Sequence, residues 1–144
     1  MTATPALTDY PHRMTIPTRW DDNDVYGHVN NVHYYAFFDT IINEYLINSG
    51  GLDIIDGPVI GFCAESHCAF TAALVFPEPV HAGLRVGHLG QSSGKYEIGL
   101  FGGGADADVP AATGWFVHVF VARETRRPAP IPDTIRGALE AIAA

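Results

Sequence analysis

The fold of this chain is decided by an acidic turn and the segment that follows it, which read Arg19-Trp20-Asp21-Asp22-Asn23-Asp24-Val25-Tyr26-Gly27-His28-Val29-Asn30-Asn31 and then residues 32–48. Three of the turn's four consecutive positions from Asp21 to Asp24 are carboxylates. Carboxylates this close repel one another, so at least one pKa should be raised unless a cation or a hydrogen-bond donor compensates. The turn therefore predicts a base or nucleophile just before a helix N-terminus, where free backbone N–H groups can hold a developing negative charge.

Residues 32–48 carry the apolar periodicity of a helix. Its stripe is formed by large apolar and aromatic side chains, namely Tyr34, Phe38, Ile41 and Tyr45, widened by Tyr35, Ile42 and Leu46. Asn30 or Asn31 can cap the N-terminus, and the glycines that follow Ser49 end the helix. Because this helix is too apolar to lie loosely on a surface, we expect a curved sheet to wrap around it.

Alternating apolar residues predict the strands of that sheet. The expected strands are 14–20, 59–75, 80–89, 95–101 and 112–123, with a Gly/Asp-rich loop at 102–110 and a last helix that begins near Asp133. One long helix inside an antiparallel sheet is an α+β arrangement. A single curved sheet around one central helix leaves a face or an edge uncovered, so we expect a homodimer or a homotetramer.

Length and charge narrow the possible functions. A chain of 144 residues is expected to form one domain, residues 1–144, with residues 1–11 as a loose N-terminal arm. The formal charge is −8. A surface this acidic repels phosphate backbones, so nucleic acid is not an expected partner, although a local basic site for a phosphorylated small molecule remains compatible.

The cysteines and the apolar runs indicate a cytoplasmic protein. Cys63 and Cys68 lie five positions apart on an expected strand. Residues of opposite parity face opposite sides of a strand, so neither a disulfide nor a shared metal is predicted. The first dozen residues lack the apolar core of a signal peptide, and no apolar run is long enough to span a membrane.

The acidic turn also carries a family resemblance. Arg-Trp-x-Asp-x-Asp-x-x-Gly-His-Val-Asn-Asn at residues 19–31, followed by an aromatic helix, resembles the hotdog-fold acyl-CoA thioesterases of the 4-hydroxybenzoyl-CoA thioesterase-like family. Residues 89–93 are similar to that family's third-strand segment, and residues 119–121 and 126–132 to its last strand and the connector after it. The resemblance implies a hotdog fold, in which a curved antiparallel sheet wraps around one long central helix.

The resemblance assigns roles to residues of the turn. The second Asp of the family's Asp-x-Asp pair corresponds to Asp24, which is implied to be a nucleophile toward the thioester carbonyl or a base for water. Backbone N–H groups around Asn31 are implied to hold the thioester oxygen, with Gly27 permitting close approach of the chain. His28 can orient Asp24 or the substrate, or can be an ordinary packed histidine. Thioester hydrolysis needs an activated oxygen and a preformed oxyanion site, and it needs no metal or organic cofactor.

Further residues are candidates for substrate binding. They lie near the turn or in the two segments that resemble the family, namely Asn30, Tyr34, Ser92, Ser93, Arg126 and Arg127. Each can instead have a purely structural role, as a helix cap, a core aromatic residue, a turn residue or part of a solvated connector. Where some family members carry basic residues beside the serines, this chain has Gly90 and Gln91, which weakens an assignment of 4-hydroxybenzoyl-CoA itself as substrate.

Other chemistries fit the spacing less well. Counting from Asp22, positions five and twelve of a calcium loop would be Tyr26 and His33, which are not calcium ligands. The separation of His28 and His33 disfavours a zinc pair, and the spacing of Asp24 and His28 differs from that of hotdog dehydratases. The Gly-x-Ser-x-Gly motif of serine hydrolases is absent from the sequence.

The sequence therefore predicts an acyl-CoA thioesterase that acts through Asp24. Two alternatives remain open. One is a non-catalytic module that binds acyl thioesters, for which Asp24 would be dispensable. The other is a thioesterase for acyl groups on an acidic carrier protein, which it would meet through the basic patch of Arg123, Arg126 and Arg127. Glu65 is the next candidate if Asp24 is not the reacting carboxylate. The sequence does not choose between nucleophile and base, or between aromatic and aliphatic acyl groups.

Overall fold

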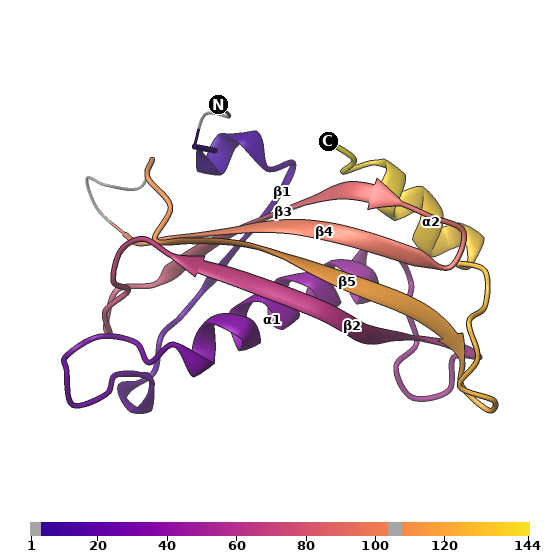
Figure 1. The fold of residues 1–144 in the computed structure, drawn as a ribbon, viewed down its shortest axis with the longest axis horizontal. Coiled ribbons are helices and arrows are strands. Elements are labelled where there is room, and N and C mark those ends of the chain that lie inside the picture. Colours follow the sequence, from indigo (N-terminus) through magenta and orange to yellow (C-terminus); the bar gives the residue numbers. More distant parts are fainter. Residues whose placement is uncertain (1–3, 104–107) are drawn as a thin grey trace.

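A computed structural model describes residues 4–103 and 108–144 and arranges them as an antiparallel sheet with a long helix along one face (Figure 1). In chain order the elements are η1 (Leu7–Asp9), β1 (His12–Ile16), η2 (Trp20–Asp22), α1 (Val32–Asn48), β2 (Val59–Phe70), β3 (Val80–Leu89), β4 (Ser93–Phe101), β5 (Ala112–Ala122) and α2 (Asp133–Glu140). The predicted α+β class with an antiparallel sheet is confirmed. Residues 104–107 of the predicted 102–110 loop lie outside the described residues.

The five strands have the order β1-β3-β4-β5-β2. Every pairing is antiparallel, and β2 pairs with β5 along its whole length, from Val59 opposite Ala122 to Phe70 opposite Ala112. β1 and β2 are therefore the edge strands. Most of β2 is exposed, including Phe62 and Phe70, which are 50% and 47% exposed.

Four strands are bounded differently from the sequence prediction: β4 begins two residues earlier, β5 ends one residue earlier, and β1 and β2 differ more. The first strand spans His12–Ile16 rather than 14–20, because Pro17 has no N–H to donate to the sheet and the chain then coils into η2. β2 ends at Phe70 rather than at residue 75, and the backbone N–H of Thr71 and Ala72 both turn onto the carbonyl of Ala111. The segment after β2 is thereby released toward the acidic turn.

The core lies between α1 and the sheet. The buried residues of α1 are Tyr34, Phe37, Phe38, Ile41, Ile42, Tyr45 and Leu46. Burial of this apolar face against the sheet is what holds the helix in this place. Phe38 packs so closely on β5 at Gly114 that a Cβ there would lie 2.5 Å from the ring. No helix within residues 4–103 and 108–144 is both long and apolar enough to cross a membrane.

The N-terminal segment, for which the sequence predicts a loose arm, is packed from η1 onward. Tyr10 is only 2% exposed and lies against Gly83 and Gly99, on the face of the sheet opposite to α1. Because those glycines have no side chains, the tyrosine ring can lie directly on the backbone of β3 and β4. Residues 1–3 of the predicted arm are outside the described residues.

A bulge corrects the prediction for the cysteines. The register of β2 shifts between Cys63 and Glu65, so Cys63 lies opposite His118 and Cys68 opposite Gly114. Those partners share one face of β5, and the two cysteines therefore project to the same side rather than to opposite sides, because a bulge inserts one extra residue and reverses the parity of the strand. Both cysteines are free.

Candidate active site

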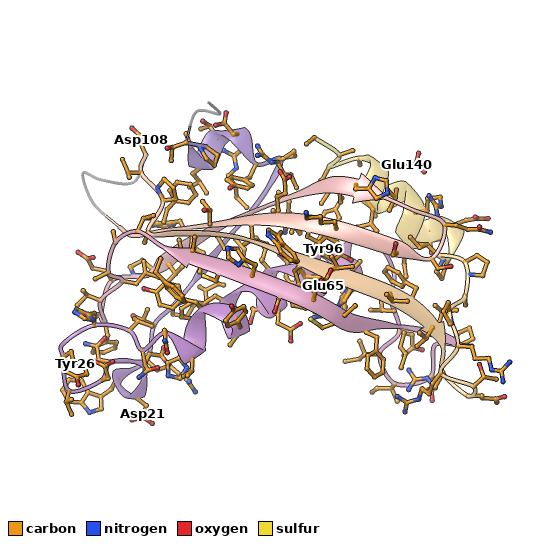
Figure 2. All side chains as sticks on the ribbon, viewed as in Figure 1. Asp21, Tyr26, Glu65, Tyr96, Asp108 and Glu140 are labelled. Atoms are coloured by element: carbon orange, nitrogen blue, oxygen red, sulfur yellow. The ribbon has the colours of Figure 1, made fainter. Side chains whose placement is uncertain are left out.

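The acidic turn lies at one end of the sheet, where α1 begins. Figure 2 shows Asp21 and Tyr26 on this loop, at the opposite end of the molecule from Glu140 on α2. Residues Asn23 and Val29 form an isolated antiparallel bridge, which makes the intervening residues a short hairpin. The N–H of Val29 donates to the carbonyl of Leu74, 2.7 Å away, and attaches this hairpin to the segment that follows β2.

Asp22 is the buried anchor of the turn. Its side chain is 2% exposed, and its carboxylate accepts hydrogen bonds from the backbone N–H of Arg19 at 2.8 Å and from the Arg19 guanidinium at 2.9 and 3.1 Å. Its backbone carbonyl accepts from the N–H of Asn30 at 2.9 Å. Asp22 therefore fixes both ends of the hairpin, in agreement with its predicted role as a turn residue.

Crowded carboxylates should have a raised pKa unless a cation or a hydrogen-bond donor compensates, and Asp22 has both. Burial acts to raise its pKa, but the Arg19 backbone N–H, the Arg19 guanidinium and the nearby His33 together lower the pKa below its ordinary value. The compensating cation is thus supplied from within the same motif. The charge of Asp22 is neutralised locally, and Asp24 is left as the carboxylate of the pair that is free to react.

Asp24 is half-buried and held at both carboxylate oxygens. Oδ1 accepts from the backbone N–H of Tyr26 at 2.8 Å, and Oδ2 accepts from the side-chain amide of Asn30 at 3.3 Å. Its own backbone N–H and carbonyl bond to His28 and Gly27, which closes the hairpin. Gly27 has a φ of +89°, a left-handed conformation that favours glycine, so its predicted part in shaping the turn has a backbone cause.

Backbone donors beside Asp24 remain free. The N–H groups of Gly27, Val29, Asn30 and Val32 are used within the turn, each with an acceptor between 2.7 and 3.1 Å away. Within the described residues the N–H groups of His28 and Asn31 have no hydrogen-bond acceptor. Asn31 is the N-cap of α1 but makes no side-chain cap bond. Asn30 supplies that acceptor instead, through Oδ1 to the Val32 N–H.

A hollow of about 580 Å³ opens beside Asp24. Its walls come from the turn, the start of α1 and the end of β2: Asp24, Tyr26, His28, Val29, Asn30, Asn31, Tyr34, Phe70, Ala72 and Ala73. Tyr34 is only 3% exposed and forms an edge-to-face pair with Phe70, with ring centroids 4.9 Å apart. Tyr34 thus supports the wall, and its hydroxyl also accepts from the Leu74 N–H.

The structure brings the predicted residues of the turn together with Tyr34, but it does not bring Ser92, Ser93, Arg126 and Arg127 to them. Ser93 pairs with Val119, whereas Phe70 at the hollow pairs with Ala112. Seven residues of β5 separate these positions, which corresponds to about 23 Å along the strand. Ser92, Arg126 and Arg127 lie at that far end as well, and both arginines are exposed.

Sequence reasoning missed five wall residues: Tyr26 and Val29 within the turn, and Phe70, Ala72 and Ala73. The last three were missed because they come from a segment far along the chain from the turn. Their signal was only the end of a predicted strand, which was placed several residues too late. Glu65, the rival carboxylate, lies in the middle of β2 in Figure 2, away from Tyr26. No group of three His, Cys, Asp or Glu side chains that could hold a metal ion occurs in the described part of the chain.

Comparison with known proteins identifies relatives of this fold and of this turn. The profile of the thioesterase-like superfamily matches residues 18–139. The search of curated proteins returns no match. The PA5185 protein from Pseudomonas aeruginosa has 51% sequence identity and a TM-score of 0.94, covering 99% of this chain and 98% of its own.

Two further solved structures extend the comparison. The PA2801 protein from Pseudomonas aeruginosa, a proposed thioesterase, is 30% identical with a TM-score of 0.83, covering 90% of this chain and 98% of its own. A thioesterase from Thermus thermophilus, solved with coenzyme A and zinc, is 26% identical with a TM-score of 0.76, covering 93% of this chain and 95% of its own. The resemblance drawn from residues 19–31 is confirmed by these matches.

Proposed function

Because the chain belongs to the thioesterase-like superfamily and is a thioester hydrolase by that membership, we propose that it hydrolyses acyl-CoA thioesters to a carboxylic acid and free CoA through Asp24. One observation carries the proposal. Asp24, His28 and Asn31 line the same hollow, and within the described residues the backbone N–H groups of His28 and Asn31 have no acceptor. A carboxylate next to free backbone donors is the pair of features that thioester hydrolysis needs.

Two routes use this arrangement. In the nucleophilic route a carboxylate oxygen of Asp24 attacks the thioester carbon, the C–S bond breaks, the CoA thiolate takes up a proton, and water hydrolyses the resulting anhydride. In the base route Asp24 removes a proton from water while the water oxygen attacks the same carbon. In both routes negative charge develops on the carbonyl oxygen, which the N–H groups of Asn31 and His28 would stabilise. The acyl group would lie against Tyr34 and Phe70.

The first experiment is release of free thiol by the wild-type chain from a panel of short, long and aromatic acyl-CoAs. We expect turnover of at least one member of the panel, and the best substrate names the acyl class. Absence of turnover on all of them would replace this proposal by the non-catalytic acyl-thioester-binding module. Comparing the carrier-bound and CoA-bound forms of one acyl group tests the carrier-protein alternative.

We further propose that the working unit is a homodimer that joins its two sheets along β2, with a homotetramer as a pair of such dimers. Within the described residues the outer edge of β2 is unpaired, and the strand exposes Phe62 and Phe70. A two-fold axis pairs identical strands antiparallel. The Phe70 end of one β2 would then meet the Val59 end of its partner, and the far-end residues of one copy would reach Asp24 of the other.

In that arrangement Ser92, Ser93, Arg126 and Arg127 serve the partner's Asp24, with the arginines binding CoA phosphates. Asn30 keeps its predicted position beside the substrate. The fold would be a hotdog domain whose sheet wraps α1 as its central helix, and the two free cysteines agree with the predicted cytoplasmic location.

Mixing two inactive variants tests the shared site. Asp24→Asn and the double variant Arg126→Ala/Arg127→Ala should each lose activity at low acyl-CoA concentration. A heterodimer isolated with two different tags carries one intact composite site, so it should recover about half of the wild-type rate. If each site lies within one subunit, the heterodimer has no intact site and no activity returns. Analytical ultracentrifugation checks that the heterodimer is a dimer.

A further inference from the structure

We propose that Asn30 is a positioning residue, which ties the carboxylate of Asp24 to the first turn of α1 and fixes the direction in which its oxygens point. This inference rests on the proposed function and gives Asn30 a task other than contact with substrate. The side chain of Asn30 connects the first turn of α1 to the Asp24 carboxylate. Oδ1 accepts from the Val32 N–H at 3.1 Å, and Nδ2 donates to Asp24 Oδ2 at 3.3 Å.

The orientation of the Asn30 amide is determined by its surroundings. A backbone N–H can only donate, so the atom that faces Val32 must be the carbonyl oxygen of the side chain. The NH₂ group then has to face Asp24, where it meets an acceptor. The helix start therefore decides which end of the amide is presented to the carboxylate.

Asn30 is also fixed through its backbone. Its N–H donates to the carbonyl of Asp22 at 2.9 Å, and its carbonyl accepts from the N–H of His33 at 3.1 Å. Asp22 is buried and bound by Arg19, so this link reaches the most firmly held residue of the turn. Asn30 is consequently held in place relative to both α1 and Asp22.

The other contact to the Asp24 carboxylate is local. The N–H of Tyr26 binds Oδ1 from two residues away, within an exposed hairpin tip where Val25 and Tyr26 are 95% and 79% exposed. Among the described residues, Asn30 is the one side chain that connects this carboxylate to a helix. Its donor restricts rotation of the carboxylate, and an attacking or proton-accepting oxygen needs such a fixed orientation.

Two substitutions separate positioning from helix capping. Asn30→Asp keeps an acceptor for the Val32 N–H but presents oxygen instead of NH₂ to Asp24. Asn30→Ser also keeps a capping acceptor, yet its side chain is too short to reach Asp24. We expect both to lower kcat about 10- to 100-fold with little change in KM or Tm.

Asn43→Asp is the matched control. Asn43 donates in the same way to a carboxylate of α1, that of Asp39 at 2.9 Å, but on an exposed part of the helix away from the hollow. This variant should keep the wild-type kcat. A capping role alone predicts unchanged kcat in both Asn30 variants, and a substrate contact predicts a rise in KM alone. Either result overturns the proposal.

Failure of the proposed function is separable from failure of this inference. If the wild type releases no thiol, the carboxyl group of Asp24 can be followed by carbon-13 NMR, with its resonance assigned through Asp24→Asn. The chemical shift of this resonance at neutral pH should then change in Asn30→Ser and Asn30→Asp, because both remove the donor to Oδ2. A chemical shift that is the same as in the wild type would overturn the positioning role without reference to turnover.

Discussion

Asp24→Asn should lower kcat for acyl-CoA hydrolysis at least about 100-fold, the loss expected when a general base or nucleophile is removed. The substitution keeps the size of the side chain and an oxygen to accept the Tyr26 N–H. It removes the negative charge, and it either sets an NH₂ group against the Asn30 amide or rotates away from it. Thiol release under saturating substrate measures the effect.

Asp21→Asn is the control for this result. Asp21 lies in the same turn and is exposed, so the variant makes the same change of charge close to the hollow without touching its wall. It should keep wild-type activity. Equal activity of Asp24→Asn and the wild type would show that another carboxylate reacts, and Glu65→Gln would then be the next substitution.

A single turnover in oxygen-18 water, together with trapping of an acyl-enzyme, separates the two chemical routes. Label that enters the Asp24 carboxylate requires a covalent acyl-enzyme anhydride that water opens at the protein's carbon. If all of the label is in the released acid, water attacked either the thioester itself or the acyl carbon of an anhydride, and trapping of an acyl-enzyme then distinguishes the base route from the nucleophilic route. Both outcomes are compatible with a large effect of Asp24→Asn, so the isotope experiment adds information that the substitution alone does not give.

Local pattern accounts for most of what the sequence predicted correctly. The 32–48 helix and the 80–89 strand have the predicted bounds, because their apolar periodicity is strong and each is closed by turn residues. The strand bounds that differ depend on contacts across the chain. β2 ends early because Thr71 and Ala72 bind Ala111, and the Cys63–Glu65 bulge that reverses the strand's parity follows from its pairing with β5.

The candidate site divides in the same way. Asp24, Gly27, His28 and Asn31 were predicted together because they are neighbours in one turn. In the structure Asp24, His28 and Asn31 line one hollow, and Gly27 shapes the turn without lining it. The buried state of Asp22 and the link from Asn30 to Asp24 could not be read from spacing, since both depend on which way the side chains turn. The resemblance grouped Ser92, Ser93, Arg126 and Arg127 with the turn. Within one chain these residues lie at the opposite end of the sheet from Asp24.

The second large effect concerns stability rather than activity, and it arises from a buried pair beneath the sheet. His118 is 4% exposed, and its Nδ1 lies 3.0 Å from the hydroxyl of Tyr96, which is fully buried. Burial lowers the pKa of His118 to about 4. Burial also raises the pKa of Tyr96, so the phenol keeps its proton and can donate to a neutral imidazole.

The sign of the pH dependence follows from the two states of His118. In the unfolded chain the imidazole titrates near its ordinary pKa of about 6.5, whereas in the folded chain it titrates near 4. Between these values the unfolded state binds more protons, so the free energy of unfolding falls as the pH is lowered from about 6.5 to about 4. The full difference corresponds to about 3 kcal/mol, with a slope of at most about 1.4 kcal/mol per pH unit.

Urea unfolding of the wild type and of His118→Gln, at fixed protein concentration from pH 4.5 to 7.5, measures this slope. The variant has no group that titrates at this position, so its stability should vary much less with pH, whatever its absolute value. The lowered pKa of Asp22 affects stability only below the ordinary carboxyl range, outside the window measured. His88→Gln, at an exposed histidine of β3, should keep the wild-type slope. Equal slopes in the wild type and His118→Gln would mean that His118 is protonated in the folded state, and that the space between α1 and the sheet admits enough water to solvate it.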